Sequence, residues 1–230
     1  MKKLATLSPG HIFNFAGEQF VVLEQRDGAA FVLLAQSKES CPFNDKRNVR
    51  NWNNYSGSTL QERIYKWVSN LPRNRKEADA ILPFKVDLSC TDQSDNYGVL
   101  EVRAAPLTLW QYGKYKDMIP LDDEFWLATP WTGQCIYSQN SRNTRYVWIV
   151  IKDGSCCGTF SDYSFGIRPA LLLNSDLLVS LDDEVEDDSC DECDTCTCGK
   201  TVDLSGVCTK DLVTDLSRRL SAEDREDNDA

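Results

Sequence analysis

The alternation of apolar and polar positions predicts antiparallel strands at the start of the chain. Two apolar segments, 12–15 and 19–24, are followed by Asp27-Gly28 and then by a third apolar segment, 30–35. An Asp-Gly pair between β-rich segments is the strongest short-range signal of a hairpin. We therefore predict that a meander of strands opens the fold.

One helix is clearly indicated in the next part of the sequence. Apolar residues recur there at the spacing of one helical face, namely Leu60, Ile64, Trp67, Val68 and Leu71. Ser58 or Thr59 can cap this helix, with Gln61 or Glu62 completing a capping box. Pro72 ends it, because proline cannot continue a helix.

Weaker patterns flank this helix. Segments 37–56 and 90–97 are rich in polar residues, and we predict loops there. A second, shorter helix is indicated over 75–82, where Pro83 follows directly. Residues 99–103 alternate in the manner of a short strand.

A last group of strands is predicted over 124–173, after a short helix that Thr108 and Gln111 open with a second capping box. An apolar segment at 145–152 leads into the turn pair Asp153-Gly154. Strands, then helices, then strands is the order of an α+β fold, with a mainly antiparallel sheet and two or three short helices. The order excludes a repeated βαβ unit.

Charge divides the chain of 230 residues into two parts. Residues 181–230 hold 17 acidic and 5 basic residues, whereas the first 180 hold 19 acidic and 20 basic residues. We predict a near-neutral globular domain at 1–180 and a disordered, acidic, Cys-rich tail at 181–230. Within the tail, the apolar spacing at 209–220 is that of a possible short helix.

The composition narrows the classes of partner and location. The domain has no basic block, so nucleic acid is not expected as a partner. No segment approaches the roughly 18 apolar residues of a membrane helix, and the first ten residues are too short and polar for a signal peptide. We therefore expect no membrane partner and a cytoplasmic location.

Several motifs resemble those of an uncharacterised family of bacterial and phage proteins, domain of unknown function 6273. The sequence Trp-Leu-Ala-Thr-Pro at 126–130 and Gly-Ile-Arg-Pro-Ala-Leu at 166–171 are similar to its paired late motifs. The segment 51–60 is similar to its helix start. The resemblance covers roughly residues 8–175, and Ala128 stands where the family usually has Arg. Membership would add a virion-associated location as an alternative.

The order of a Trp-containing strand, an Asp-Gly turn and a late Arg-containing strand is also similar to C-type-lectin-like and formylglycine-generating-enzyme-like domains. This resemblance implies a C-type-lectin-like scaffold whose late loops face a ligand. It leaves the oligomeric state and the identity of the ligand open, because a fold by itself does not establish a function.

Three residues of the late strands are predicted to be structural: Trp126, Trp148 and Arg168. Arg168 is flanked by apolar residues, so its guanidinium requires partners such as the carbonyls of a neighbouring loop. A ligand contact is the alternative for Arg168. The two tryptophans lie in strand patterns, where aromatic rings more often fill a core than stack on a cofactor.

The loop 131–144 and the segment 161–164 are the predicted ligand-binding region. Rigid rings supply area and short polar groups supply hydrogen bonds in adaptable binding loops. An ordinary polar surface loop is the alternative interpretation. The candidate ligand-binding residues are Trp131, Gln134, Tyr137, Asn140, Arg142, Asn143, Asp162 and Tyr163.

The tail contains the only candidate metal ligands of the sequence, at Cys190, Cys193, Cys196 and Cys198. Four thiolates can hold a zinc ion, but a zinc ribbon needs two separated pairs. The surrounding carboxylates oppose thiolate formation, so free or oxidised thiols are the favoured alternative. No other cofactor is expected.

No catalytic residues are predicted. His11 is the single histidine and stands at a strand start, so neither a Ser-His-Asp nor a Cys-His arrangement can be built without it. A non-catalytic recognition module for a glycan or protein is therefore the first hypothesis. A scaffold that acts through the acidic tail is the second. The third is a thiol- or metal-dependent enzyme of the formylglycine-generating type, using Cys135, Cys156 or Cys157.

Overall fold

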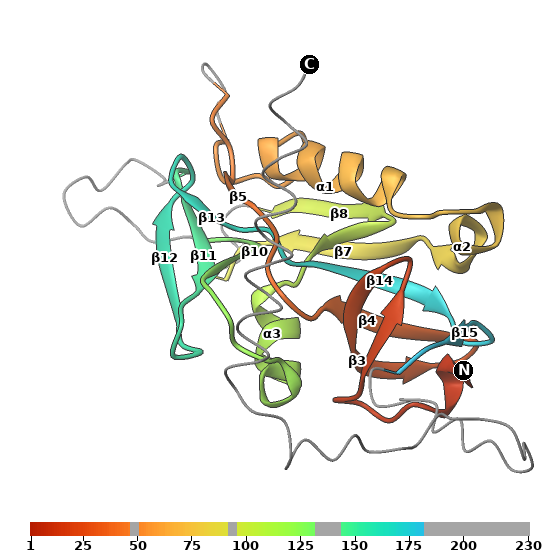
Figure 1. Ribbon diagram of the computed structural model, residues 1–230. Helices are drawn as coiled ribbons and strands as arrows, with labels where there is room; N and C mark the ends of the chain where they lie inside the picture. The colour runs from red at the N-terminus through yellow and green to blue at the C-terminus, as the bar shows by residue number, and fades with distance from the viewer. Residues whose placement is uncertain (47–50, 92–95, 132–143, 182–230) are drawn as a thin grey trace, which may run out of the picture. The chain divides into compact units, whose positions relative to one another are not determined.

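In the computed structural model, strands are the commonest regular elements, and three short α-helices accompany them. The structure describes residues 1–46, 51–91, 96–131 and 144–181 (Figure 1). The helices among them are α1 (Thr59–Asn70), α2 (Arg75–Ala80) and α3 (Leu109–Tyr115). This confirms the α+β class, whereas the C-type-lectin-like assignment stays a prediction. The tail from residue 182 onward, including the predicted helix at 209–220, lies outside the described residues.

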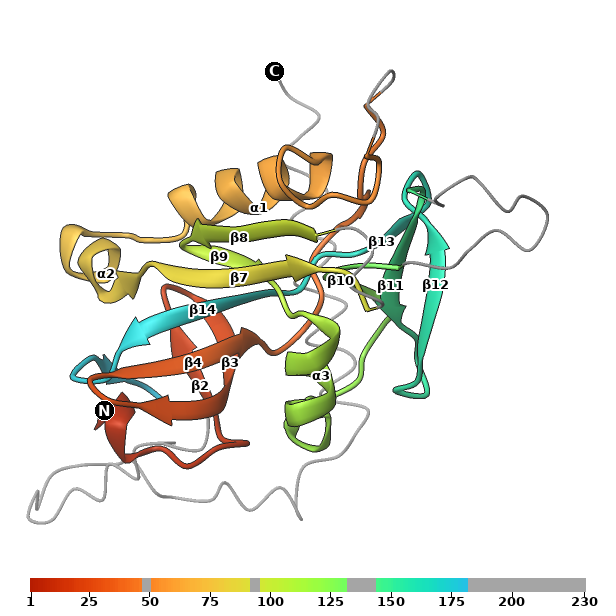
Figure 2. The ribbon, with the colours of Figure 1, turned by 180° about the vertical axis from the view of Figure 1, so that it is seen from behind.

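An antiparallel sheet of six strands carries most of the core. Its order is β2-β3-β4-β14-β6, and β9 pairs with β14 as well. The predicted meander forms its first three strands, and Asp27-Gly28 makes the turn between β3 and β4. Figures 1 and 2 show β14 running beside β4. The strand bounds are β2 (Ile12–Phe15), β3 (Glu18–Arg26), β4 (Ala29–Leu34), β6 (Ile81–Leu82), β9 (Ala104–Pro106) and β14 (Pro169–Asn174).

A second sheet has five strands in the order β12-β11-β10-β13-β5. Its pairings are antiparallel except that of β10 with β13. The predicted turn at Asp153-Gly154 joins β11 to β12. The strand bounds are β5 (Ser40–Pro42), β10 (Phe125–Pro130), β11 (Tyr146–Val150), β12 (Cys156–Phe160) and β13 (Ser164–Gly166).

Two smaller sheets and two 3-10 helices complete the described elements. One sheet pairs β7 with β8, and the other pairs β1 with β15. No helix among the described residues is long and apolar enough to cross a membrane. The remaining bounds are β1 (Lys2–Lys3), η1 (Leu4–Thr6), β7 (Phe84–Ser89), β8 (Asn96–Val102), η2 (Lys116–Met118) and β15 (Leu178–Val179).

Three predicted segments were wrong in part. Strand β5 lies inside the predicted loop 37–56, and β8 begins at Asn96, inside the predicted loop 90–97. The predicted helix 75–82 ends at Ala80, and its last two residues form β6 against β14. Strands β5 and β6 are stabilised by partners distant in the sequence, which a local pattern does not reveal.

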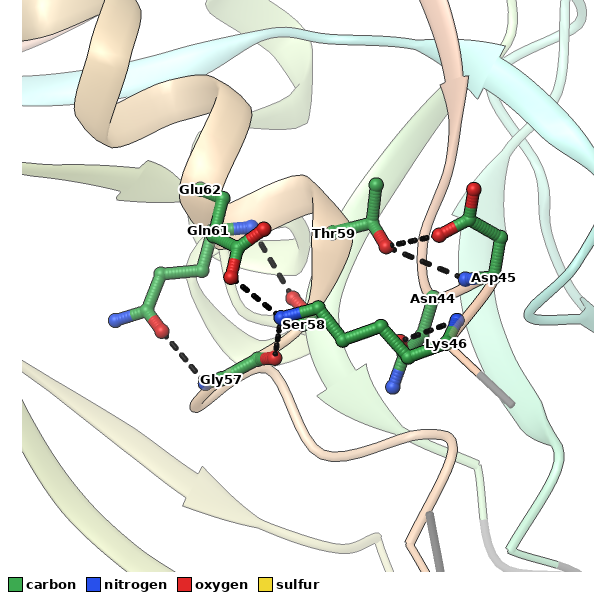
Figure 3. A network of polar contacts seen from close by, with 8 residues as sticks. All are labelled: Asn44, Asp45, Lys46, Gly57, Ser58, Thr59, Gln61 and Glu62. Carbon is green, nitrogen blue, oxygen red and sulfur yellow. Dashed lines mark hydrogen bonds and ion pairs between the residues drawn. The ribbon is translucent and has the colours of Figure 1, made fainter. Parts of the chain in front are cut away.

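Helix α1 begins at a network of polar contacts that ties it to the segment after β5 (Figure 3). The Ser58 hydroxyl accepts a hydrogen bond from the Gln61 amide at 3.1 Å. The Gln61 side chain accepts from the Gly57 amide, so the predicted capping box is displaced by one residue. Lys46 Nζ donates to the Gly57 carbonyl at 2.7 Å and pairs with Glu62 at 2.5 Å. The helix thereby presents Leu60, Ile64 and Val68 to the core.

Helix α3 begins with the capping box predicted from Thr108 and Gln111. The Thr108 hydroxyl accepts from the Gln111 amide at 3.2 Å, and the Gln111 side chain accepts from the Thr108 amide at 2.8 Å. Further along the helix, the Tyr112 hydroxyl donates to the Gly154 carbonyl at 2.7 Å. Helix α3 therefore supports the turn between β11 and β12.

The buried guanidinium of Arg168 connects the two large sheets. Arg168 precedes β14, and its Nε donates to the carbonyl of Leu34 at 2.8 Å, while Nη2 donates to that of Ala35. Its Nη1 pairs at 3.3 Å with Asp122, just before β10. Its Cζ lies 5.0 Å from the centre of the Phe125 ring. Burial lowers the pKa of Arg168, and the nearby Asp122 carboxylate opposes that shift.

We expect Arg168→Met to lower the free energy of unfolding by about 3 kcal/mol, because the carbonyls of Leu34 and Ala35 lose their buried donor. Urea denaturation measures the change. Arg63→Met is the control, since Arg63 makes an exposed ion pair with Glu39 that contributes about 1 kcal/mol at most. Equal losses in the two variants would contradict the structural role of Arg168.

The carboxylate of Glu24 joins β3 to α3. It accepts from Lys114 Nζ at 2.5 Å, from the Tyr115 hydroxyl at 2.8 Å and from Arg26 Nε at 2.8 Å. These contacts, that of Lys114 above all, lower the pKa of Glu24 to about 2. The folded protein thus binds this proton more weakly than the unfolded chain does.

The contribution of Glu24 is present above its ordinary pKa and is lost as the pH falls toward 2. We expect wild type to exceed Glu24→Gln in stability by about 1 kcal/mol at pH 7. The difference should shrink between about pH 4.5 and 2, as followed by thermal unfolding at each pH. Glu101→Gln serves as a control for the loss of an exposed carboxylate. A stability difference between wild type and Glu24→Gln that did not change with pH would contradict the ionic role of Glu24.

Candidate functional site

The β11–β12 hairpin has two unlike faces. Residues directly opposite each other share a face, and the register pairs Tyr146 with Phe160 and Trp148 with Gly158. Val147 and Ile149 point to the other face and are buried. Tyr146, Trp148 and Phe160 are only half-buried, so this face of the hairpin keeps its aromatic side chains partly in solvent.

Five aromatic side chains form a continuous row on this face, which we call the aromatic ladder. The ring of Trp131, from the residue after β10, lies between those of Trp148 and Tyr146, with centroids 6.1 and 5.0 Å away. Phe160 follows at 4.4 Å from Tyr146, and Tyr163 lies 5.7 Å beyond Phe160. The members of the ladder are Trp148, Trp131, Tyr146, Phe160 and Tyr163.

A glycine in β12 makes room for the Trp131 ring. A Cβ atom at Gly158 would lie 2.7 Å from Cδ2 of Trp131, closer than real Cβ contacts. The Trp131 amide also donates to the carbonyl of Tyr146 at 3.0 Å. The ring is therefore held against Gly158 by the hydrogen bond of its own main chain and by the neighbouring rings.

A buried asparagine holds one end of the hairpin in place. The amide of Asn53 donates to the carbonyl of Thr144 at 2.8 Å, and its side chain donates to that of Tyr146 at 3.1 Å. Its side-chain oxygen accepts from the Tyr97 hydroxyl at 2.8 Å. The start of β11 thus depends on the segment before α1 and on β8. Sequence reasoning missed Asn53, although it lies in the motif segment 51–60.

Two charged residues adjoin members of the ladder in the sequence, Arg145 and Asp162. Arg145, next to Tyr146, places its guanidinium 4.9 Å from the centre of the Trp52 ring. The amide of Ser161 donates to the carbonyl of Arg145 at 2.8 Å, so the hydrogen bonding between the two strands continues past the end of β12. Asp162 is exposed, and Tyr163 has 55% of its surface exposed. An exposed carboxylate therefore directly precedes the exposed Tyr163 in the chain.

The structure brings together two of the predicted ligand-binding residues that are distant in sequence, Trp131 and Tyr163. Tyr146 and Phe160 connect them, and sequence reasoning missed both, although they are aromatic residues in strand positions. Asp162 adjoins the ladder. The other predicted ligand-binding residues lie outside the described residues: Gln134, Tyr137, Asn140, Arg142 and Asn143.

The tryptophans of this region differ in burial. Trp148, predicted to be structural, is half-buried; it packs against the hydrophobic core and contacts Trp131 in the aromatic ladder. A ligand-binding role for Trp131 leads us to expect an exposed ring, whereas the residue is half-buried against Gly158. Trp126 agrees with its prediction, because it is fully buried and its Nε1 donates to the carbonyl of Cys41 at 2.8 Å.

Cys41, Cys156 and Cys157 form no disulfide within the described part of the chain. Cys156 and Cys157 are adjacent in β12, so their side chains point to opposite faces. Burial raises the pKa of both thiols. No group of three or more metal-ligating side chains occurs among the described residues, and Cys190, Cys193, Cys196 and Cys198 lie outside them. His11 is exposed, and its Nδ1 lies 3.1 Å from the carbonyl of Ser8.

The cavities of the described domain lie away from the ladder. One of about 390 Å³ lies between the β2–β3 turn and α1, where Arg63 and Glu39 pair with each other. Another of about 390 Å³ lies between α1 and the β8–β9 region and is lined by Tyr65, Val68 and Arg103 among others. Neither concentrates several aromatic rings as the ladder does, so the ladder is the stronger candidate site.

Comparison of the chain with family models, curated proteins and solved structures found no match. The resemblance to domain of unknown function 6273 therefore stays a prediction. The candidate site rests on the geometry of the hairpin alone.

We expect Gly158→Ala to displace the Trp131 ring, because the new Cβ would lie 2.7 Å from it. The overpacking should lower the free energy of unfolding by about 1–2 kcal/mol and change the tryptophan fluorescence. Gly113→Ala in α3 is the matched control, since its Cβ would meet nothing within 4 Å. An unaltered emission spectrum in Gly158→Ala would show that Trp131 does not rest on this glycine.

Proposed function

We propose that the described domain is a non-catalytic recognition module that binds its ligand, a glycan or a protein, over the aromatic ladder. The observation that carries the proposal is the row of five packed rings that remain partly in solvent. A folded chain buries large rings where it can, and partly exposed apolar groups gathered on one face are typical of interaction sites.

The packing of the ladder supports a role in binding. Each ring is held by the next, and Trp131 is also held over Gly158, so little side-chain freedom is lost when a ligand arrives. The exposed faces of the rings are electron-rich and attract the polarised C–H groups of sugars or the edges of other rings. Asp162, adjacent to Tyr163 in the chain, adds an exposed carboxylate at one end of the row.

The same geometry favours recognition over thiol chemistry. A nucleophilic thiol needs a lowered pKa, whereas burial raises the pKa of Cys156 and Cys157. Their side chains on opposite faces do not suit joint action on one substrate. Cys135, the third thiol of the enzyme hypothesis, lies outside the described residues. The scaffold hypothesis rests on the tail and is not favoured by any contact in the described domain.

A C-type-lectin-like architecture is part of the proposal. It is supported by the late Trp-containing strand β10, by the turn at Gly154 and by the buried Arg168 before β14. In such a scaffold the late loops and the adjoining strands face the ligand. The aromatic ladder occupies that part of the chain.

The full chain should be screened on glycan and surface-protein arrays, together with Trp131→Ala and Tyr163→Ala. We expect both variants to weaken binding by about tenfold or more, because truncation of an aromatic residue at the centre of an interface costs about 2 kcal/mol. Trp110→Ala is the matched control, since Trp110 is 71% exposed on α3 and outside the ladder.

Far-ultraviolet circular dichroism and the midpoint of thermal unfolding verify that each variant keeps its fold. A ligand that binds equally well to wild type and to both ladder variants would refute the proposed site. A ligand lost equally in Trp110→Ala would refute it too.

A further inference from the structure

Strand β12 ends the five-stranded sheet. It pairs with β11 on one side, and no other described strand pairs with it. Figures 1 and 2 both show β12 as the outermost strand beside β11. A strand in this position presents backbone donors and acceptors that a further strand can pair with.

The hydrogen bonds of the hairpin identify which groups face outward. The amide of Ser161 donates to the carbonyl of Arg145, and the amide of Ile151 donates to that of Ser155. Along a pair of antiparallel strands, hydrogen-bonded residue pairs alternate with pairs that are not hydrogen-bonded. Cys157 and Thr159 therefore also direct their backbone groups to β11. Cys156, Gly158 and Phe160 therefore direct theirs away from the sheet.

The outward groups are largely without partners among the described residues. The carbonyl of Phe160 accepts from the amide of Tyr163 at 3.2 Å. No hydrogen bond within the described part of the chain involves the amides of Cys156, Gly158 and Phe160. The same holds for the carbonyls of Cys156 and Gly158. An added strand would meet a regular row of donors and acceptors.

This edge lacks the devices that natural sheets use to prevent pairing. Charged residues, prolines and very short strands are the usual protections. At the opposite end of the same sheet, β5 has only three residues and contains Pro42. The five residues of β12 include neither a charge nor a proline.

We propose that β12 binds an extended segment of another polypeptide as an added strand of the sheet. The inference rests on the proposed recognition function and commits its ligand to a polypeptide. Alternate side chains of the added strand would lie on the same face as the aromatic ladder, beside Phe160 and Tyr163, which fits apolar or aromatic residues. Main-chain hydrogen bonds then supply affinity, and the ladder supplies selectivity.

Acidic residues at the two ends of β12 indicate the charge expected in the added strand. Asp153 precedes β12 and Asp162 follows it, and both are exposed. The neighbouring Lys152 already pairs with Asp123 at 3.5 Å. A basic residue next to the apolar positions of the added strand would therefore meet a carboxylate. The expected ligand is an extended segment with alternating apolar residues and a basic residue at one end.

The experiment is a selection of random twelve-residue peptides displayed on phage against the full chain. We expect the enriched peptides to share the alternating apolar pattern with a flanking basic residue. Binding of a synthetic copy should weaken about tenfold in Cys156→Pro, which removes one outward amide, and should change less than about twofold in Cys156→Ala. Proline is tolerated at the first residue of an edge strand.

A second measurement does not depend on a variant that folds. The same peptide, N-methylated at alternate amides, should lose binding to wild type, and the unmodified peptide should protect the Gly158 amide from hydrogen exchange. Peptides that bind Cys156→Pro and wild type alike, without such protection, would overturn the added strand. If their binding, or that of a glycan, is still lost in Trp131→Ala, the ladder remains the recognition site and only this inference fails. Failure to enrich any peptide would overturn the inference as well.

Discussion

A single buried guanidinium connects the parts on which the candidate site depends. Arg168 stands between β13 and β14, that is, between a strand of the five-stranded sheet and the central strand of the six-stranded one. Its bonds to the carbonyls of Leu34 and Ala35 and to Asp122 join the end of β4 to the entry of β10. A buried charge is tolerated only when it is fully paired. The end of β4, the segment before β10 and the start of β14 are therefore held in one arrangement.

The aromatic ladder is a consequence of that arrangement. Strand β10 ends at Pro130, and the next residue, Trp131, reaches across β11 to the glycine in β12. The buried face of the hairpin, with Val147 and Ile149, packs on the core and keeps the opposite face turned outward. Partly exposed rings of this kind cost stability in solvent, and they are retained in a rigid row that suits recognition.

The ladder and the free edge of β12 are two aspects of one hairpin. The side chains of Tyr146 and Phe160 occupy one face of the hairpin. The ring of Trp131 packs on Gly158, and the amide of the same glycine points away from the sheet. A polypeptide strand can use both aspects at once, because its backbone repeats at the spacing of the outward groups of β12 while its side chains meet the rings. This match is the reason for proposing a polypeptide ligand.

Local pattern was sufficient for the elements whose stability is local. The caps at Ser58 and Thr108, the apolar face of α1 and the turns at Asp27-Gly28 and Asp153-Gly154 follow from neighbouring residues, and the structure has them where the sequence predicts. The α+β class follows from their order. The burial of Arg168 was also predictable, since an arginine among apolar residues needs carbonyl partners.

Tertiary structure alone decided the rest. Strands β5 and β6 exist because β13 and β14 pair with them, across more than a hundred and about ninety residues respectively. The ladder likewise depends on the register that sets Tyr146 opposite Phe160 and on the glycine under Trp131. Pairing across the chain determines which aromatic residues meet and which face remains in solvent, and the spacing of residues along a single strand does not contain that information.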